Sequence, residues 1–369
     1  MGHQTGKSRV ALLYGGYWDE RDISIESAKQ VAVALCRDEL LVTPVRWDVG
    51  GWVRLRDLQP AEINTTPQRI DVLTQPGVVR APFEVMAELR ADGLGVVFLA
   101  LHGGPGEDGT IQGFLEVCGV PYTGAGVHGS AIACNKQSFR EAAMSLGIEV
   151  AHGTVIDRAD WDEDPAEVLT ELSVDVGFPA VVKPLLSGSS FGVQKVADAS
   201  QLEDHLELLF DRDRWVLVEQ FVNGREVTIP CLGHRVGQPP DVLPIVEIEP
   251  LTATGIFDVE AKYSPGRARE TVPAQLDKEL TEHLEAIAIA IHERLDLGAM
   301  SRTDVVLGAE GPVVLETNTI PGLTAASLMP LAAAAAGIDM TSLCRRIIDY
   351  ALSAHLARGA SAAPTAGHS

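Results

Sequence analysis

The chain has 369 residues, of which 46% are hydrophobic, so it holds enough apolar material for a globular core in two or three domains. Its formal net charge of -22 argues against a nucleic acid or an anionic membrane as the main partner, because both require a basic face. A phosphate ligand remains compatible with this charge, since it needs only a local cluster of cations. No apolar run is long enough to predict a membrane-spanning helix.

The cysteines and the first residues indicate a cytoplasmic protein. The five cysteines are widely spaced without a CxxC pair, so we expect neither a disulfide framework nor a zinc site. Residues 1–8 lack the apolar core of a signal peptide. Gly6-Lys7-Ser8 is similar to part of a Walker loop, but its spacing from Gly2 is one residue short and no strand precedes it, so we reject that interpretation.

Two strands that run into glycine turns are predicted near the start of the chain. Residues 9–14 form an apolar run before Gly15-Gly16, and residues 94–101 form another before the turn 102–106. We expect Ser24 to cap the helix that follows the first turn. Further elements are a helix at 110–118 and a short strand at 120–123.

This alternation predicts a parallel α/β layer with ligands at the carboxyl ends of its strands. Glu20 and His102 follow two of these strand ends. Glu20 either binds an ammonium group or pairs with Arg21, and His102 is either a substrate contact or a structural residue.

The remainder of the chain predicts two further units. From about residue 136 we expect a helix, then an α+β unit with one inserted helix near 198–209. The predicted strands of that sheet are 180–183, 192–196, 215–221 and 226–232. The third unit is predicted to contain 242–249 as a strand, 275–295 as a long helix, and 301–307 and 313–318 as strands, before a disordered tail from about 358.

Carboxylates gather on the last two predicted strands, which the turn 308–311 joins into a hairpin. Alternation places Arg302 and Asp304 on one face of the first strand, and Glu316 and Asn318 on one face of the second. If the two faces coincide, their oxygen atoms suit Mg²⁺. The alternative is a solvated sheet face on which Arg302 pairs with Asp304.

A lysine and a small-residue loop suggest a phosphate site. Lys183 stands at a strand end, and Gly188 and Gly192 border a loop whose backbone N–H groups could wrap a phosphate and act as a lid. The alternative is an ordinary hairpin turn.

Taken in order, these motifs resemble the D-alanine–D-alanine ligase family over about residues 10–352. The segments that carry the resemblance are Leu101-His102-Gly103-Gly104, Glu107-Asp108-Gly109-Thr110-Ile111-Gln112-Gly113, Pro121-Tyr122-Thr123-Gly124, Val182-Lys183-Pro184, Gly188-Ser189-Ser190, Gly224-Arg225-Glu226, Glu260-Ala261-Lys262-Tyr263 and Glu316-Thr317-Asn318-Thr319-Ile320-Pro321-Gly322-Leu323-Thr324. The resemblance implies α/β and α+β units in a three-domain ATP-grasp fold. The expected bounds are 1–135 for a parallel α/β substrate domain, 136–225 for the central ATP-grasp domain, 226–357 for the C-terminal catalytic domain and 358–369 for the tail.

The resemblance also implies a role for each site residue. The expected ATP-binding residues are Lys136, Lys183 and Ser190 at the phosphates, Glu219, Gln220, Phe221 and Val222 at the adenine, and Glu226 at the ribose. Asp304, Glu316 and Asn318 would hold two Mg²⁺ ions, with Mn²⁺ as a possible substitute. Glu20 would bind the ammonium of the first amino acid beside His102, in a network with Ser189 and Tyr263. Arg302 and the Gly322 N–H would stabilise an oxyanion, Lys262 would lie near the γ-phosphate, and Ser327 with the Leu328 N–H would hold the second carboxylate.

The implied activity is ATP-dependent ligation of two D-alanines through an acyl phosphate, for peptidoglycan synthesis, by a homodimer. Small amino acids and ATP are the expected partners. A related dipeptide ligase that uses another amino acid at one or both positions is the alternative, possibly in secondary metabolism. It rests on departures from the family pattern: Ser187 replaces a Glu, Ile320 and Ala326 replace more polar residues, and Tyr17-Trp18 is bulkier than the usual pair. Tyr263 argues against a depsipeptide ligase.

Overall fold

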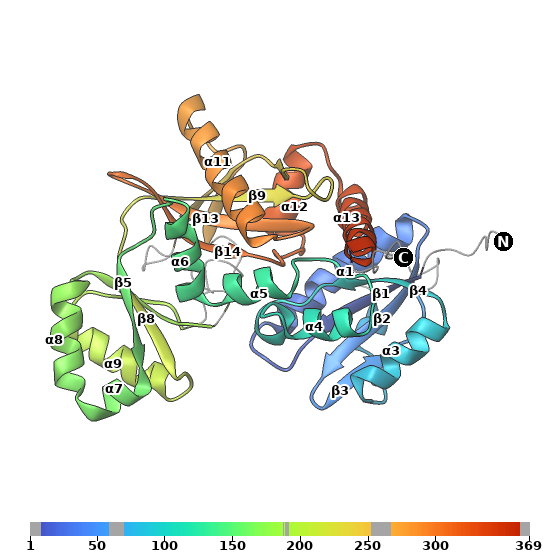
Figure 1. Ribbon diagram of the computed structural model, residues 1–369, viewed down its shortest axis with the longest axis horizontal. Coiled ribbons are helices and arrows are strands. Elements are labelled where there is room, and N and C mark those ends of the chain that lie inside the picture. The colour runs from blue at the N-terminus through green and yellow to red at the C-terminus, as the bar shows by residue number, and fades with distance from the viewer. Residues whose placement is uncertain (1–8, 59–69, 187, 189–191, 252–266, 362–369) are drawn as a thin grey trace, which may run out of the picture.

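The computed structural model describes residues 9–58, 70–186, 188, 192–251 and 267–361, with side chains up to residue 358. In these ranges the strands form three sheets, each with helices packed against it (Figure 1). None of the described helices is both long and apolar enough to cross a lipid bilayer.

The N-terminal unit is built on a four-stranded sheet of order β3-β2-β1-β4. β1 pairs in parallel with β2 and β4, whereas β3 is an antiparallel edge strand, so the predicted parallel layer is confirmed for three strands. The elements are β1 (Arg9–Gly15), α1 (Arg21–Arg37), β2 (Leu41–Asp48), β3 (Gly51–Arg54), α3 (Pro82–Ala91), β4 (Leu94–Leu99) and α4 (Thr110–Val117). The predicted strand at 120–123 is reduced to a single parallel bridge between Val97 and Tyr122.

Ser24 does not cap α1, because this helix begins at Arg21. The buried Ser24 hydroxyl instead accepts the Gly15 N–H at 2.7 Å and donates to the Ala100 carbonyl at 2.6 Å. Ser24 therefore joins the ends of β1 and β4. In the sequence, a serine near the start of a helix cannot be told from an N-cap residue.

The central unit has a four-stranded antiparallel sheet of order β5-β8-β6-β7. Its elements are β5 (Gly153–Asp157), α7 (Arg158–Glu163), α8 (Pro165–Asp175), β6 (Ala180–Pro184), β7 (Gln194–Val196), α9 (Ala199–Phe210) and β8 (Trp215–Gln220). The prediction that 226–232 belongs to this sheet is wrong. That strand, β9 (Arg225–Leu232), pairs with three strands of the third sheet, and its buried Val227 and Ile229 pack into the third unit's core.

The third unit contains a six-stranded sheet, in which β12-β11-β9-β13-β14 are neighbours and β10 pairs with β9. Its elements are β9, β10 (Asp241–Val242), β11 (Val246–Pro250), β12 (Ala268–Thr271), α11 (Lys278–Leu295), β13 (Met300–Gly308), β14 (Gly311–Asn318), α12 (Leu328–Ala335) and α13 (Met340–Ser361). α5 (Val127–Cys134) and α6 (Lys136–Ser145) pack on this unit through Ala133 and Phe139. We expected α6 in the central unit, but its apolar face is buried here.

The predicted hairpin is confirmed, and it contains a bulge. Arg302 lies opposite Asn318 and Asp304 opposite Glu316, but Val305 lies opposite Val314, so Leu315 is the extra residue. The bulge turns Val314 into the core while Leu315 lines a cavity with Glu316. Val314 is therefore buried in the core, whereas the half-buried Leu315 faces the cavity.

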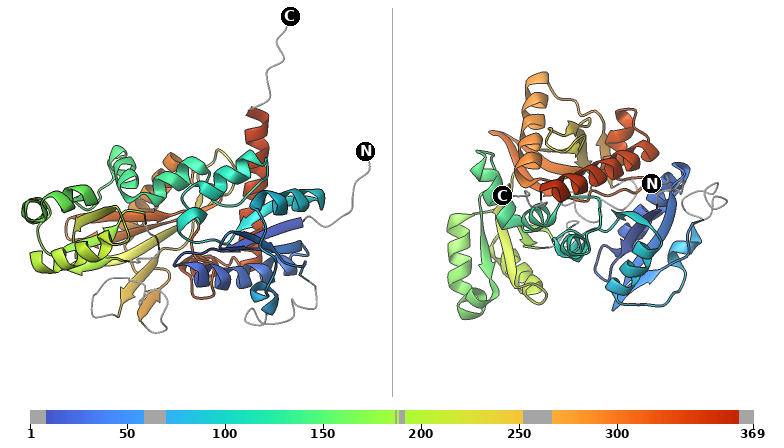
Figure 2. Two further views of the ribbon diagram at one scale, coloured as in Figure 1. Left: turned by 90° about the horizontal axis from the view of Figure 1, so that it is seen from below. Right: turned by 45° about the vertical axis from the view of Figure 1, so that its right-hand side comes forward.

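α13 packs against α1 and so ties the third unit to the N-terminal one (Figures 1 and 2). The helix runs to Ser361, so residues 358–361 are helical and not part of a disordered tail as predicted. Alanine-rich sequence favours continuation of a packed helix. The rest of the predicted tail lies outside the described residues.

Candidate functional site

Two cavities meet at the β13–β14 hairpin. The first, which we call the nucleotide cavity, has a volume of about 280 Å³ and lies between the central and third sheets. The second, the loop cavity, measures about 430 Å³ and lies between the N-terminal unit and the loop after β14. A small space of about 40 Å³ adjoins both, because Lys136 and Glu316 also line the nucleotide cavity and Glu107 and Asn318 also line the loop cavity.

The predicted site residues that the structure describes line these two cavities. The nucleotide cavity is lined by Lys136, Lys183, Glu219, Gln220, Phe221, Val222, Glu226, Asp304 and Glu316. The loop cavity is lined by Glu20, His102, Arg302, Asn318, Ile320, Gly322, Ala326, Ser327 and Leu328. Ser187, Ser189, Ser190, Lys262 and Tyr263 lie outside the described residues.

Buried cations line one side of the nucleotide cavity. The Lys183 ammonium pairs with Glu219, whose other carboxylate oxygen lies 3.1 Å from the Arg140 guanidinium. Burial lowers the pKa of Lys136, and the charge of Glu316 partly offsets this effect. These groups offer positive charge in a site from which water is largely excluded, where it acts more strongly on a phosphate than in water.

The hinge between β8 and β9 forms another wall of the nucleotide cavity. The Gln220 N–H donates to the His152 carbonyl at 2.8 Å and the Phe221 N–H to the Pro179 carbonyl at 3.0 Å, so the hinge backbone is fixed. The Lys195 ammonium lies 3.5 Å from the centroid of the Phe221 ring. A rigid, partly apolar wall of this kind suits a flat base.

The hairpin carboxylates face the cavities, although Asp304 also pairs with Arg302. The guanidinium donates to both Asp304 oxygens, at 2.9 and 2.8 Å, and the Asn318 amide donates to one of them at 3.2 Å. Asp304 is buried, so the face is not a solvated one. Of the earlier alternative, the ion pair between Arg302 and Asp304 is therefore confirmed, and the solvated face is wrong.

Asp304, Glu316 and the Asn318 amide oxygen form a donor set that fits a hard cation such as Mg²⁺. All three come from facing positions of one hairpin and line the two cavities. Within the described ranges no group of three or more His, Cys, Asp or Glu side chains is arranged to hold a metal. The candidate metal site therefore depends on two carboxylates and one amide.

The loop cavity is built from long-range hydrogen bonds to the segment 320–323. The His102 Nδ1 lies 3.1 Å from the Ile320 carbonyl, and its Nε2 lies 2.8 Å from the Ser27 hydroxyl. Since a carbonyl only accepts, Nδ1 carries the proton and Nε2 accepts from Ser27. Ser27 in turn accepts the Leu323 N–H at 3.2 Å. Burial lowers the pKa of His102 to about 4, so the ring is neutral near pH 7. His102 therefore both lines the cavity and holds the segment 320–323 in place through its hydrogen bonds.

Two carboxyl groups face the inner end of the loop cavity. Glu20 is buried at the start of α1, and Glu107 accepts the Gly103 N–H at 2.9 Å and the Ile320 N–H at 3.0 Å. Burial, and next the charge of Glu20, raise the pKa of Glu107 to about 8. Such a pair favours a bound cation, such as an ammonium group. Sequence reasoning gave Glu107 no role, although its place in the Glu-Asp-Gly motif was a signal.

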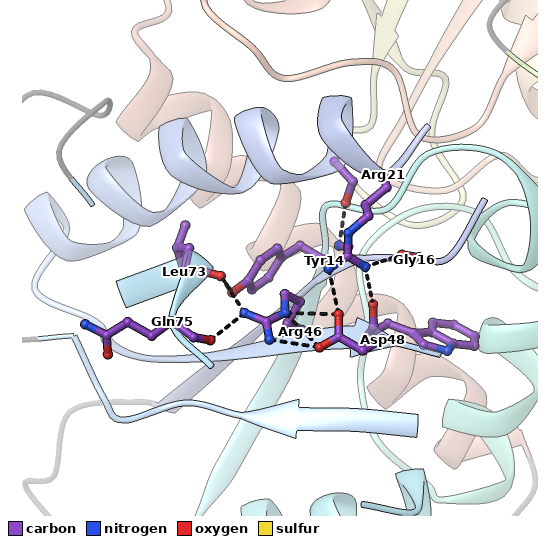
Figure 3. A network of polar contacts seen from close by, with 10 residues as sticks. Tyr14, Gly16, Arg21, Arg46, Asp48, Leu73 and Gln75 are labelled. Carbon is purple, nitrogen blue, oxygen red and sulfur yellow. Dashed lines mark hydrogen bonds and ion pairs between the residues drawn. The ribbon is translucent and has the colours of Figure 1, made fainter. Parts of the chain in front are cut away.

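Arg21 has partners other than Glu20. Its guanidinium pairs with Asp48 at 2.7 Å and donates to the Gly16 carbonyl, while Arg46 binds the same Asp48 from the other side (Figure 3). This network fixes both ends of the segment that carries Glu20. Arg21, Arg140 and Ser27 all support the site, and sequence spacing gave no sign of these contacts.

At the outer end of the loop cavity, Ser327 stands at the start of α12. Its hydroxyl accepts the Thr324 N–H at 3.0 Å and lies 2.8 Å from the Thr324 hydroxyl. A Cβ at Gly322 would approach the Ser327 hydroxyl to 2.6 Å, so this loop needs glycine. Leu328 is the first residue of α12, so its N–H has no acceptor within the helix and is suited to bind an anion.

The comparisons with known proteins agree with this geometry. Two family models match, described as the D-ala D-ala ligase N-terminus over residues 9–125 and the D-ala D-ala ligase C-terminus over residues 143–349. A D-alanine–D-alanine ligase of Syntrophobacter fumaroxidans is 38% identical, with 94% of this chain and 99% of that protein covered.

Solved structures show the same similarity. The D-alanine–D-alanine ligase of Coxiella burnetii is 25% identical with a TM-score of 0.77, over 96% of this chain and 97% of that one. The corresponding Bacillus anthracis ligase complexed with ATP is 27% identical with a TM-score of 0.71, over 95% and 100%. With both family models and a full-length relative in agreement, the chain belongs to the D-alanine–D-alanine ligase family.

Proposed function

We propose that this protein joins two D-alanines into D-alanyl-D-alanine with ATP, through an acyl phosphate. The observation that carries the proposal is the meeting of two cavities at Glu316 and Asn318, one lined by buried lysines and the other by paired carboxyl groups. A γ-phosphate in the first cavity would meet a carboxylate in the second at this junction. The family's curated relatives carry the name of this activity.

In the first step, a carboxylate oxygen of the first D-alanine attacks the γ-phosphorus, and the bond to the bridging oxygen of ADP breaks. Lys136 and Lys183 offset the charge that otherwise repels the two anions. Glu20, with Glu107 beside it, holds the ammonium of the first D-alanine. Ser189, Tyr263, Lys262 and Ser190 keep the roles that the resemblance implies, as part of this proposal.

In the second step, the neutral amine of the second D-alanine attacks the acyl carbon, phosphate departs with its oxygen, and the amine loses a proton. Arg302 and the Gly322 N–H stabilise the oxyanion. Ser327 and the Leu328 N–H hold the second carboxylate.

We propose that Asp304, Glu316 and Asn318 hold two Mg²⁺ ions, or Mn²⁺ in their place. When bound, the ions would neutralise phosphate charge and align the γ-phosphate. The support is the donor set itself, three oxygen-bearing side chains at facing positions of one hairpin.

The adenine would lie along Glu219, Gln220, Phe221 and Val222, with Glu226 at the ribose. These residues line one continuous wall of the nucleotide cavity, which supports the assignment.

The wider setting of the activity is proposed as well. We propose a cytoplasmic enzyme of peptidoglycan synthesis, which suits five cysteines that form no disulfide. We also propose a homodimer through the N-terminal unit, where Val78, Val79 and Phe83 are exposed apolar side chains. The three sheets support three domains divided near residues 136 and 226, with α6 as the exception that packs on the third.

A screen of ATP-dependent phosphate release against D- and L-amino acids tests the proposed activity. We expect release with D-alanine and Mg²⁺, and transfer of one ¹⁸O atom from labelled D-alanine carboxylate to phosphate. Release with a different amino acid but not with D-alanine would contradict the proposal, as would unlabelled phosphate. A Glu310→Ala variant, altered in the exposed hairpin turn, serves as an active control.

A further inference from the structure

Trp18 bridges two loops of the N-terminal unit. Its indole N–H donates to the His102 carbonyl at 2.6 Å. The ring also packs against two glycines, since a Cβ at Gly16 would lie 2.7 Å from it and a Cβ at Gly104 would lie 3.3 Å from it. One side chain therefore spans from the loop after β1 to the loop after β4.

The indole is held in place from its outer side. The Tyr17 ring lies edge-on at 5.2 Å and the Trp47 ring edge-on at 5.4 Å between centroids. Trp47 in turn contacts Trp52, which is fully buried and contacts Phe114. Edge-to-face aromatic pairs favour one orientation, so the ring is anchored to the core of the sheet.

The two loops carry groups whose separation is tightly set. A Cβ at Gly103 would lie 1.4 Å from a Glu20 carboxylate oxygen, so the backbone of the second loop touches the acid of the first. His102 extends the same loop to the Ile320 carbonyl on the far side of the cavity. A shift of the second loop would therefore move both the Gly103 backbone and the His102 contact with Ile320 relative to Glu20.

The two neighbouring attachments of this segment do not replace Trp18. Arg21 ties the segment back to Gly16 and Asp48, within the first loop and β2 (Figure 3). The Asp19 ion pair with Arg212 of the central unit, at 3.0 Å, is exposed and therefore weak. The Trp18 N–H, by contrast, reaches the His102 loop directly.

We propose that Trp18 is a positioning residue, which sets the spacing between Glu20 and the His102-Gly103 loop and thereby the affinity for the first amino acid. This inference rests on the proposed function, because it assumes that Glu20 binds the ammonium of that amino acid. Trp18 touches no substrate in this account and acts through the His102 carbonyl.

Trp18→Phe tests the proposal, because it keeps an aromatic ring and removes the N–H. The binding constant of D-alanine is measured calorimetrically in the presence of Mg²⁺ and a non-hydrolysable ATP analogue, beside KM for ATP, KM for the second D-alanine and Tm. We expect first-site binding to weaken about tenfold, as follows from the loss of one half-buried hydrogen bond, with KM for ATP within twofold.

Trp47→Phe is the matched control, because Trp47 belongs to the same aromatic cluster, whereas the hydrogen bond to the His102 carbonyl comes from Trp18. First-site binding equal in the two variants would overturn the proposal, and so would an equal weakening for all three substrates. If Trp18→Phe fails to fold, replacement of Trp18 by benzothienylalanine keeps the ring size and removes only the N–H. Absence of D-alanine ligation in the unaltered enzyme would instead refute the proposed function.

Discussion

The two cavities differ in how they are built. The nucleotide cavity is lined by residues on strands and at strand ends, such as Lys183 at the end of β6 and Glu219 in β8. The loop cavity is lined by loops that hydrogen bonds hold together, as with His102 and Ile320. The charged side chains of the first cavity can therefore be located from local sequence spacing, while the shape of the second depends on contacts between distant segments.

The largest effect is expected from a substitution where the two cavities meet. Glu316→Ala removes a carboxylate from the junction, where phosphoryl transfer would occur, so kcat should fall about 10³-fold while KM for either substrate changes little. Steady-state kinetics with ATP and D-alanine measures this. A fall below threefold would show that the junction is not the reaction centre, and Glu310→Ala should behave like the unaltered enzyme.

A substitution in the loop cavity should change the binding of D-alanine without changing the binding of ATP. Gly103→Ala places a methyl group into the Glu20 carboxylate at a positive φ of 64°, so KM for D-alanine should rise about 100-fold with KM for ATP unchanged. Gly119→Ala is a matched control, because Gly119 has the same φ of 64° but open space around its Cβ position. Equal effects of the two variants would mean that backbone strain alone, and not Glu20, is responsible.

A substitution in the nucleotide cavity should have the opposite selectivity and change the binding of ATP alone. Lys183→Met removes a buried cation and leaves Glu219 paired with Arg140, so KM for ATP should rise about tenfold with first-site D-alanine binding unchanged. Kinetics at saturating D-alanine gives KM for ATP, and Lys278→Met, a change at a highly exposed side chain, is the control. A selective loss of D-alanine affinity would contradict the division between the cavities.

The existence of the hairpin could be predicted from the sequence, and alternation indicated that Arg302 and Asp304 share one face, as do Glu316 and Asn318. Their register was left open, and it is the bulge that brings Arg302 opposite Asn318. The bulge at Leu315 was not predictable, since one extra residue leaves the local pattern nearly unchanged. The sheet to which β9 belongs was also predicted wrongly, because the apolar pattern of a strand does not indicate which strands it pairs with.

The supports of the loop cavity were largely beyond sequence reasoning. His102 binds Ile320 across 218 positions and Ser27 binds Leu323 across 296, so no local pattern records either contact. The same limit explains Ser24, whose two backbone partners lie on different strands. Glycine turns at strand ends did predict where these loops would meet.

The last prediction concerns the pH dependence of stability, which two buried histidines influence. His102 lies in the loop cavity and His292 in the third unit, where its Nε2–H donates to the Gly298 carbonyl and its Nδ1 accepts from Ser301. Burial lowers the pKa of both to about 4, so the folded state binds fewer protons than the unfolded state. Stability is then steady above the unfolded pKa of about 6.5, falls as pH drops from there to about 4, and levels off below.

Between pH 7 and 5, His292→Gln should remove about 2 kcal/mol of this acid-induced loss without altering KM for either substrate. Urea unfolding at pH 7, 6 and 5 gives the free energy of unfolding for both proteins. The difference between them should shrink as pH falls, because only the unaltered protein must protonate this ring on unfolding. A constant difference across that range would contradict a neutral, buried His292.

A crystal structure with a non-hydrolysable ATP analogue, Mg²⁺ and D-alanine tests the arrangement most directly. The account predicts triphosphate beside Lys136 and Lys183, metal ions at Asp304, Glu316 and Asn318, and the D-alanine carboxylate facing the γ-phosphate at the junction. A nucleotide bound elsewhere, or metal-free carboxylates turned away from every phosphate, would contradict it.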